Sequence, residues 1–183
     1  PCLESEIPSS QSNYDLTQLI NSLSNCEEIV MMPYQHEVPQ LKLSKLKKLS
    51  LNGYGSPIKI KSINDHVFYH CDELEEVDLR KNSIDFISEN AFRFKNPHSD
   101  KILEIDLYNN NLNENSFSCL STERPVILWL NDNHIKYLKE DSFKPFFDSN
   151  QRNYVWFAKN DIDLTAQQNR WIYDGYETRI HRF

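Results

Sequence analysis

The feature that most constrains this chain is a pattern that returns every 20–28 residues. The pattern is apolar-x-x-apolar-x-apolar-x-x-Asn-x-apolar, and Leu74, Val77, Leu79, Asn82 and Ile84 form a complete copy. A pattern that recurs at this spacing indicates a stack of similar structural units, each unable to bury its apolar face alone. Six copies begin at Cys26, Leu46, Leu74, Ile102, Pro125 and Arg152, with spacings of 20, 28, 28, 23 and 27 residues.

A second pattern follows the first. Ile84-x-x-Ile87-x4-Phe92 has counterparts that begin at Ile60 and Ile135, and a shortened form runs from Leu112 to Phe117. Each unit therefore predicts a short strand, a turn and a return segment, with the strands parallel and about 4.8 Å apart. An asparagine at the turn can satisfy backbone groups of neighbouring units, which predicts a structural role for Asn82, Asn110, Asn133 and Asn160.

The two linked patterns are the signature of leucine-rich repeats. We therefore predict an α/β fold, a leucine-rich repeat solenoid of about six repeats with a curved parallel sheet on its concave face. One domain would span residues 1–183: an N-terminal cap at 1–25, the repeats at 26–162 and a C-terminal cap at 163–183. The first cap should hold a short amphipathic helix. In the second, Trp171, Tyr173 and Tyr176 should cover the last strand.

The run from Leu74 to Phe143 resembles extracellular leucine-rich repeat proteins. The tail Asn160–Leu164, followed by Arg170-Trp171-Ile172, is similar to their C-terminal cap, although Asp161 replaces a proline and the cap cysteines are absent. The stretch Phe143–Phe147 is similar to arthropod secreted repeat proteins of the luciferase non-catalytic-subunit type. The resemblance implies a secreted or extracellular protein without catalytic activity of its own.

Composition excludes several functions. Twenty basic against 27 acidic side chains give a net charge of −7, which disfavours nucleic acid and anionic membrane as partners. The apolar run Val126–Leu130 is too short to span a bilayer, so no membrane insertion is expected. No apolar segment near Pro1 is typical of a signal peptide. If the protein is secreted, we expect that its signal peptide has already been removed from this chain.

The cysteines suggest an oxidising compartment. Cys2 and Cys26 flank the N-terminal cap and suit a disulfide. Cys71 occupies the slot that Leu120 fills two repeats later, which predicts a buried thiol about 10 Å from Cys119, too far for a bridge. A reduced cytosolic protein with four thiols remains the alternative.

The candidates for chemistry are weak. His66, His70 and Cys71 could be metal ligands, but Cys71 is a core position and no fourth ligand is nearby in the sequence, so we expect no metal and no cofactor. Glu75 and Glu76 point to opposite faces of a strand. No catalytic signature occurs, and we expect a protein that is not an enzyme. A basic run, Lys42 to Lys48, is either a solvated return segment or a contact for an acidic partner.

The concave face is the informative surface. Strand alternation places an acidic group on repeats three and four and an aromatic group on repeats five and six. Exposed tryptophans are common interface anchors, unless a cap, a loop or a self-contact covers them. We predict a protein-recognition module. The alternatives are an accessory subunit that stabilises a secreted enzyme, a self-associating protein and a metal-dependent enzyme. The predicted binding residues are Asp78, Glu104, Asp106, Tyr108, Ile127, Trp129, Asn131, Tyr154 and Trp156.

Overall fold

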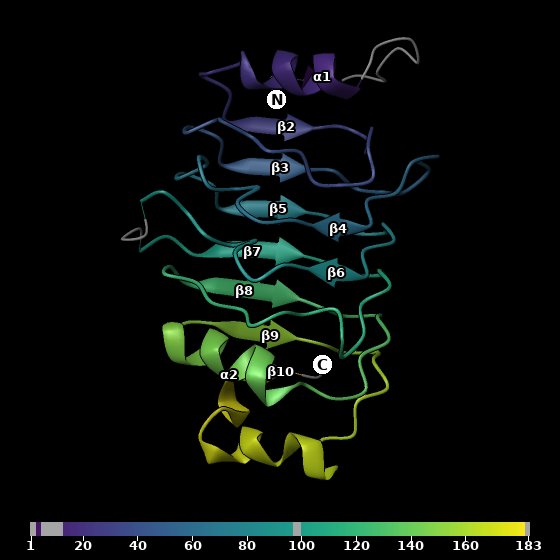
Figure 1. The fold of residues 1–183 in the computed structure, drawn as a ribbon, viewed down its shortest axis with the longest axis vertical. Helices are drawn as coiled ribbons and strands as arrows, with labels where there is room; N and C mark the ends of the chain where they lie inside the picture. Colours follow the sequence, from purple (N-terminus) through teal and green to yellow (C-terminus); the bar gives the residue numbers. More distant parts are fainter. Residues whose placement is uncertain (1–2, 5–12, 97–99, 182–183) are drawn as a thin grey trace.

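The computed structural model describes residues 3–4, 13–96 and 100–181. Within these residues, eight short strands form one open parallel sheet, the main sheet, and all but the outermost pairs join consecutive repeats (Figure 1). Its order is β1-β2-β3-β5-β7-β8-β9-β10. Six strands lie where the repeat predicts them: β2 (Glu28–Val30), β3 (Lys48–Ser50), β5 (Glu76–Asp78), β7 (Leu103–Asp106), β8 (Val126–Trp129) and β9 (Tyr154–Trp156).

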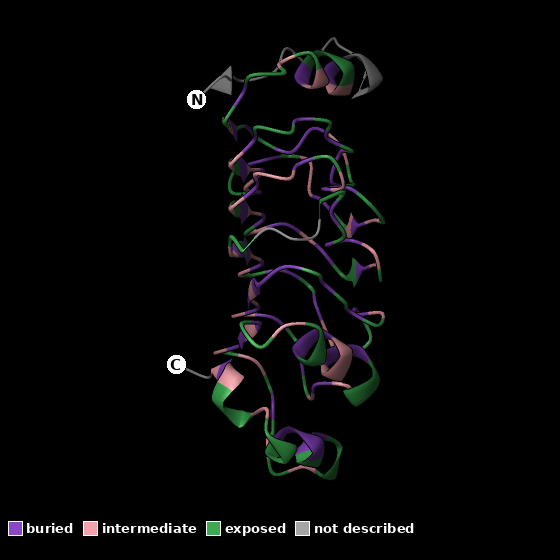
Figure 2. Ribbon diagram, turned by 90° about the vertical axis from the view of Figure 1, so that its left-hand side faces the viewer, coloured by how far each residue is buried: buried purple, intermediate pink, exposed green. Residues whose placement is uncertain are grey.

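Two further strands extend the main sheet at its ends, β1 (Leu3–Glu4) and β10 (Ile180–His181). A small second sheet pairs β4 (Ser62–Ile63) with β6 (Phe86–Ile87). It lies on the side of the molecule away from the main sheet (Figure 2). The mixed α/β class is thus confirmed, with a mostly parallel, open sheet.

The helices gather at the two ends. Helix α1 (Asn13–Asn21) lies at the N-terminal end, and α2 (Glu140–Ser149) lies near the C-terminal end (Figure 1). Two 3-10 helices follow β9, η1 (Gln167–Asp174) and η2 (Glu177–Arg179). Figure 2 shows the main sheet along one long side, with α1 and α2 toward the opposite side.

Helix α2 replaces a simple return segment. Phe143, Phe146 and Phe147 are buried, and their i, i+3, i+4 spacing places all three on one face of the helix. Glu140 and Asp141 lie in the first turn, where carboxylates favour a helix N-terminus. The helix also accommodates Pro145. The repeat pattern predicts only that Phe143 is buried. The spacing of the three phenylalanines explains why this return segment is a helix.

The core lies behind the main sheet. Each of the six central strands sends at least one side chain inward, and one of these from every strand, no more than 2% exposed, forms part of a common row. These six side chains are in register across the sheet, so they stack into a continuous apolar row. The row consists of Ile29, Leu49, Val77, Ile105, Leu128 and Val155.

The recurring asparagines connect neighbouring units. The Asn133 side-chain amide donates to the Leu107 and Leu130 carbonyl oxygens, both at 3.0 Å, and its Oδ1 accepts the Leu112 N–H at 3.0 Å. Asn82, Asn110 and Asn160 make the equivalent contacts in their own units. Each asparagine thus satisfies backbone groups that its turn would otherwise leave orphaned.

The residue before each of these asparagines is left-handed. Lys81, Asn109, Asp132 and Lys159 have φ between 56° and 57°. Only glycine, asparagine and aspartate adopt this conformation readily, so two of the four units place a strained lysine there.

The C-terminal end differs from the prediction. Strand β10 pairs with β9 and covers most of its edge, with Ile180 opposite Val155. Trp171 is buried and donates its indole N–H to the Leu138 carbonyl at 3.0 Å, whereas Tyr173 is 58% exposed. Backbone pairing with β10 thus covers the edge of β9, which the aromatic side chains were expected to cover. Trp171 packs instead against the segment that contains Leu138.

A buried arginine ties three segments together. Arg124 is 1% exposed, and its guanidinium donates to the carbonyls of Lys101 and Asp72. It also lies 4.8 Å from the centre of the Phe94 ring. Burial lowers the pKa of Arg124, against the opposing field of nearby carboxylates. The arginine therefore acts as a polar clamp inside the molecule.

The structure describes three of the four cysteines. Cys26 and Cys71 are buried, Cys119 is exposed, and Cys71 is not bonded to Cys119. The predicted partner of Cys26, Cys2, lies outside the described residues, so the disulfide stays a prediction. Burial raises the pKa of the Cys71 thiol to about 11.

Candidate interaction surface on the main sheet

The outward side chains of the main sheet form what we call the outer sheet face. The strand register aligns them into columns as the repeat pattern predicts. The middle column also gains a member from β10, which the pattern did not predict. This column runs Val30, Ser50, Asp78, Asp106, Trp129, Trp156 and His181.

Three rings stack at the C-terminal end of this column. The Trp129 and Trp156 ring centres lie 4.9 Å apart with planes at 17°, and the Trp156 and His181 rings lie 4.3 Å apart at 21°. Both tryptophans are partly exposed. His181 therefore covers one face of the Trp156 ring. The expectation that the C-terminal cap could shield the tryptophans is thus met in part, for Trp156.

The indole nitrogens of this pair are available. Among the described residues, neither Trp129 nor Trp156 donates a side-chain hydrogen bond, whereas the indole of Trp171 does. An indole N–H on a partly exposed face is satisfied by water or by a ligand. The aromatic row thus combines apolar area with free donors.

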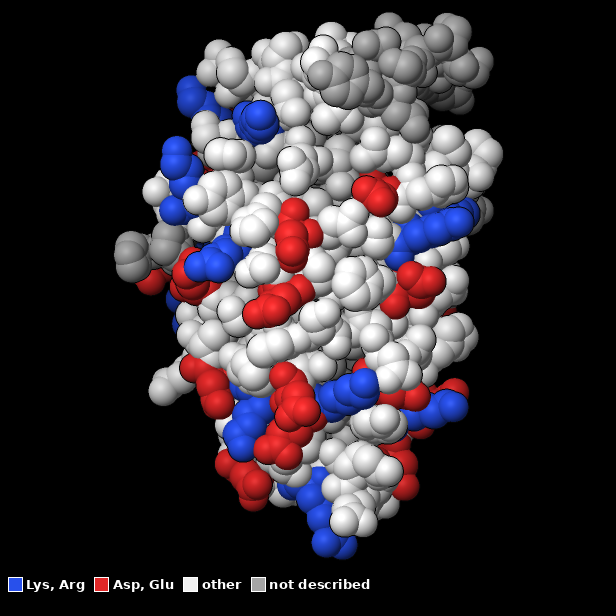
Figure 3. Space-filling view, viewed as in Figure 1, with Lys and Arg blue, Asp and Glu red and all other residues white. Residues whose placement is uncertain are grey.

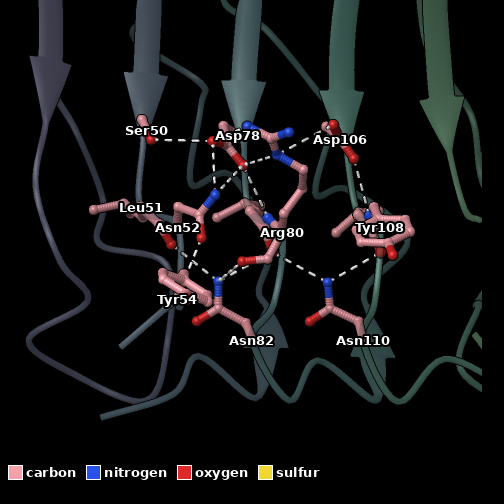
Figure 4. A network of polar contacts seen from close by, with 12 residues as sticks. Ser50, Leu51, Asn52, Tyr54, Asp78, Arg80, Asn82, Asp106, Tyr108 and Asn110 are labelled. Atoms are coloured by element: carbon pink, nitrogen blue, oxygen red, sulfur yellow. Dashed lines mark hydrogen bonds and ion pairs between the residues drawn. The ribbon is translucent and has the colours of Figure 1, made fainter. Parts of the chain in front are cut away.

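A polar network adjoins the aromatic row. Asp78 accepts hydrogen bonds from Arg80, with Nε and Nη2 at 2.9 and 3.0 Å, and from Asn52 at 3.1 Å (Figure 4). Ser50 and the Arg80 backbone N–H also donate to it. Both carboxylate oxygens of Asp78, one of the predicted binding residues, are therefore engaged within the chain.

Arg80 also reaches the next carboxylate. Its Nε lies 3.4 Å from Asp106 Oδ2, while the Tyr108 backbone N–H donates to Asp106 Oδ1 at 3.0 Å. Burial raises the pKa of Asp106, because these interactions do not offset the loss of water around the carboxylate. The sequence places Arg80 on this face, but which carboxylates its long side chain bonds depends on rotamers that no periodicity specifies.

An open hollow of about 340 Å³ lies between the network and the aromatic row. Glu76 there pairs with Lys48 at 2.8 Å. Glu104 is exposed and makes no ion pair or side-chain hydrogen bond with any described residue. The lining residues are Glu76, Val77, Asp78, Arg80, Glu104, Asp106 and Trp129.

The remaining predicted residues border this surface. Ile127 and Tyr154 are partly exposed neighbours in register on β8 and β9. Asn131 Oδ1 accepts the Ala158 backbone N–H at 2.7 Å, so this side chain supports the next unit. Tyr108 is partly exposed beside the network. The predicted residues thus lie on one face, but Asp78 and Asn131 have structural partners.

Other kinds of site find little support. Within the described ranges, no group of three or more His, Cys, Asp or Glu side chains could hold a metal ion, and the Cys71 side chain is buried in the core. No described helix is both long and apolar enough to cross a bilayer. On the side away from the main sheet, acidic and basic side chains are interspersed (Figure 3).

No protein-family model matches the chain, and no curated protein matches it either.

Proposed function

We propose that this chain is a secreted leucine-rich repeat solenoid that recognises another protein through its outer sheet face and performs no catalysis. The regular strand register and the asparagine contacts support the solenoid. The observation that carries the function is the stacked pair Trp129 and Trp156 on that face. Aromatic rings in such a position are frequent anchors of protein interfaces.

The rigidity of the face favours binding. Both rings project from paired strands and hold each other in place, so few rotamers are lost when a partner docks. The carboxylates beside them would steer a basic partner toward the surface. The partner would thus meet an apolar anchor and a negative field on adjacent strands.

Partner capture with matched variants tests the proposal. The immobilised chain is exposed to its native extracellular fluid, and captured proteins are compared among wild type, Trp129→Ala and Trp156→Ala, with Tyr173→Ala as an exposed aromatic control away from this face. We expect either tryptophan variant to weaken capture by at least about 2 kcal/mol in binding free energy and the control to retain it.

Thermal unfolding of each variant separates binding from folding. Because Trp156 also stacks on His181, its removal should lower the thermal midpoint more than removal of Trp129. A folded double variant that still captures the same partner in full would show that the binding face lies elsewhere.

A further inference from the structure

We propose that the partner presents an arginine to the outer sheet face, with its guanidinium in the hollow between Trp129 and the carboxylates of Glu104 and Asp106. This inference rests on the proposed function and specifies the chemistry of the partner. Three independent features of the surface support it: its charge balance, the free face of Trp129 and the spacing of the two carboxylates.

Four carboxylates line the hollow, but among the described residues only two cations, Arg80 and Lys48, pair with them. Arg80 lies between Asp78 and Asp106, with two strong bonds to Asp78 and a longer contact of 3.4 Å to Asp106. Lys48 pairs with Glu76. Among the described residues no cation pairs with Glu104, and Asp106 has only its share of Arg80. The hollow therefore keeps a negative excess that a partner's cation would neutralise.

The row of side chains continues with Trp129. Asp78 is opposite Asp106, and Asp106 is opposite Trp129, on the adjacent strands β5, β7 and β8. One face of the Trp129 ring stacks on Trp156, and Trp129 also lines the hollow. A cation in the hollow would thus contact both an indole ring and carboxylates, which is the arrangement that favours cation–π binding.

The spacing of the carboxylates selects arginine over lysine. Glu104 and Asp106 are two residues apart on one strand and face the same side, so their Cα atoms are about 6.6 Å apart. A planar guanidinium can stack on an indole while its fork of N–H donors reaches both carboxylates, whereas an ammonium is a compact point charge. Arg80 shows that one guanidinium on this face can contact two carboxylates, because its Nε lies 2.9 Å from Asp78 Oδ1 and 3.4 Å from Asp106 Oδ2.

The test uses a peptide with one arginine and follows the indole N–H signals by NMR. The probe is acetyl-Gly-Gly-Arg-Gly-Gly-amide, and the matched probes carry citrulline, which is neutral and of the same shape, or lysine. The chain has three tryptophans, and the buried Trp171 is the internal reference. We expect the arginine peptide to shift the Trp129 signal in a saturable way, the lysine peptide to bind more weakly, and the citrulline peptide to leave the signal unchanged.

Two variants complete the test. Glu104→Gln should lower the affinity of the arginine peptide by up to about fivefold, and the exposed Glu89→Gln on another face should leave it unchanged. Equal shifts with arginine and citrulline, or an affinity insensitive to Glu104→Gln, would overturn the arginine site. So would an unperturbed Trp129 signal, even where Trp129→Ala abolishes partner capture; the proposed function would then stand without this inference.

Discussion

Asp78 and Asp106 lie opposite each other on adjacent strands and share Arg80, yet the pKa values of their carboxyl groups move in opposite directions. Burial raises the pKa of both. At Asp78 this is outweighed by hydrogen bonds from Arg80, the Arg80 backbone N–H and Asn52, which together lower the pKa. At Asp106 the Tyr108 N–H and the field of Arg80 are too weak to do so. The two pKa values differ in direction because the Arg80 guanidinium makes two hydrogen bonds to Asp78 and only a longer contact to Asp106.

This pair predicts two opposite effects of pH on stability. Asp78 has a lowered pKa, so its stabilising contribution is present above the ordinary value of about 3.9 and is lost as the pH falls through the folded-state pKa. Asp106 has a raised pKa, so its own contribution to stability is fully present below about 3.9 and is lost as the pH rises through the folded-state pKa.

We therefore expect Asp78→Asn to destabilise the chain at pH 7 and Asp106→Asn to stabilise it. Both differences from wild type should shrink in acid. Urea unfolding of the three proteins between pH 3 and pH 7 measures this, and shifts of the same sign at pH 7 would contradict the assignment.

Replacing a recurring asparagine should weaken two units at once. Asn133→Ala leaves the Leu107 and Leu130 carbonyls and the Leu112 N–H without this partner, so we expect a loss of about 1–3 kcal/mol. Asn111→Ala, at an exposed side chain, is the control. Denaturant melts give the comparison; an Asn133→Ala midpoint equal to wild type, with an unchanged slope, would contradict the structural role.

The buried arginine should also matter for stability. Arg124→Ala removes a large buried side chain and leaves the Lys101 and Asp72 carbonyls without its N–H donors, so we expect a loss of about 2–4 kcal/mol. Arg152→Ala is the control, because Arg152 is exposed and, among the residues that the structure describes, its guanidinium contacts the Asp100 carbonyl alone. Equal urea midpoints for the two variants would show that Arg124 is not a clamp.

One substitution should stabilise the chain. Lys159 has φ of 57°, a conformation that costs most side chains about 1–2 kcal/mol and that asparagine tolerates better. Lys159→Asn should therefore raise stability by about 0.5–1 kcal/mol. Lys136→Asn, at an exposed position without positive φ, should not. Thermal melts of both variants decide the matter, and a lower midpoint for Lys159→Asn would count against the strain.

The cysteines should differ in reactivity. Cys71 is buried and its pKa is about 11, so it should resist iodoacetamide at pH 8 in the folded chain and react only in denaturant. Cys119 is exposed and should react in the native state. Non-reducing peptide mapping of the same samples should show a Cys2–Cys26 peptide pair. Rapid native labelling of Cys71, or a bridge from Cys71 to Cys119, would refute this pattern.

The repeat pattern predicted the strands and their columns because register in a parallel stack depends on spacing alone. Thus Asp106, Trp129 and Trp156 are in register along one column, as expected. The pattern could not predict the role of Arg80, since its ion pairs depend on side-chain conformation. It also missed His181, because the pattern ends near Ile162 and strand β10 comes from a segment without it.

The asparagine contacts all run backward along the chain. The Leu51 carbonyl receives its bond from Asn82, 31 residues later, and the Leu130 carbonyl receives its bond from Asn160, 30 residues later. During synthesis, each strand thus emerges from the ribosome before the side chain that completes its turn. The asparagine bonds that complete one turn can therefore form only after most of the next unit has been made, so this step of folding trails synthesis by about one unit.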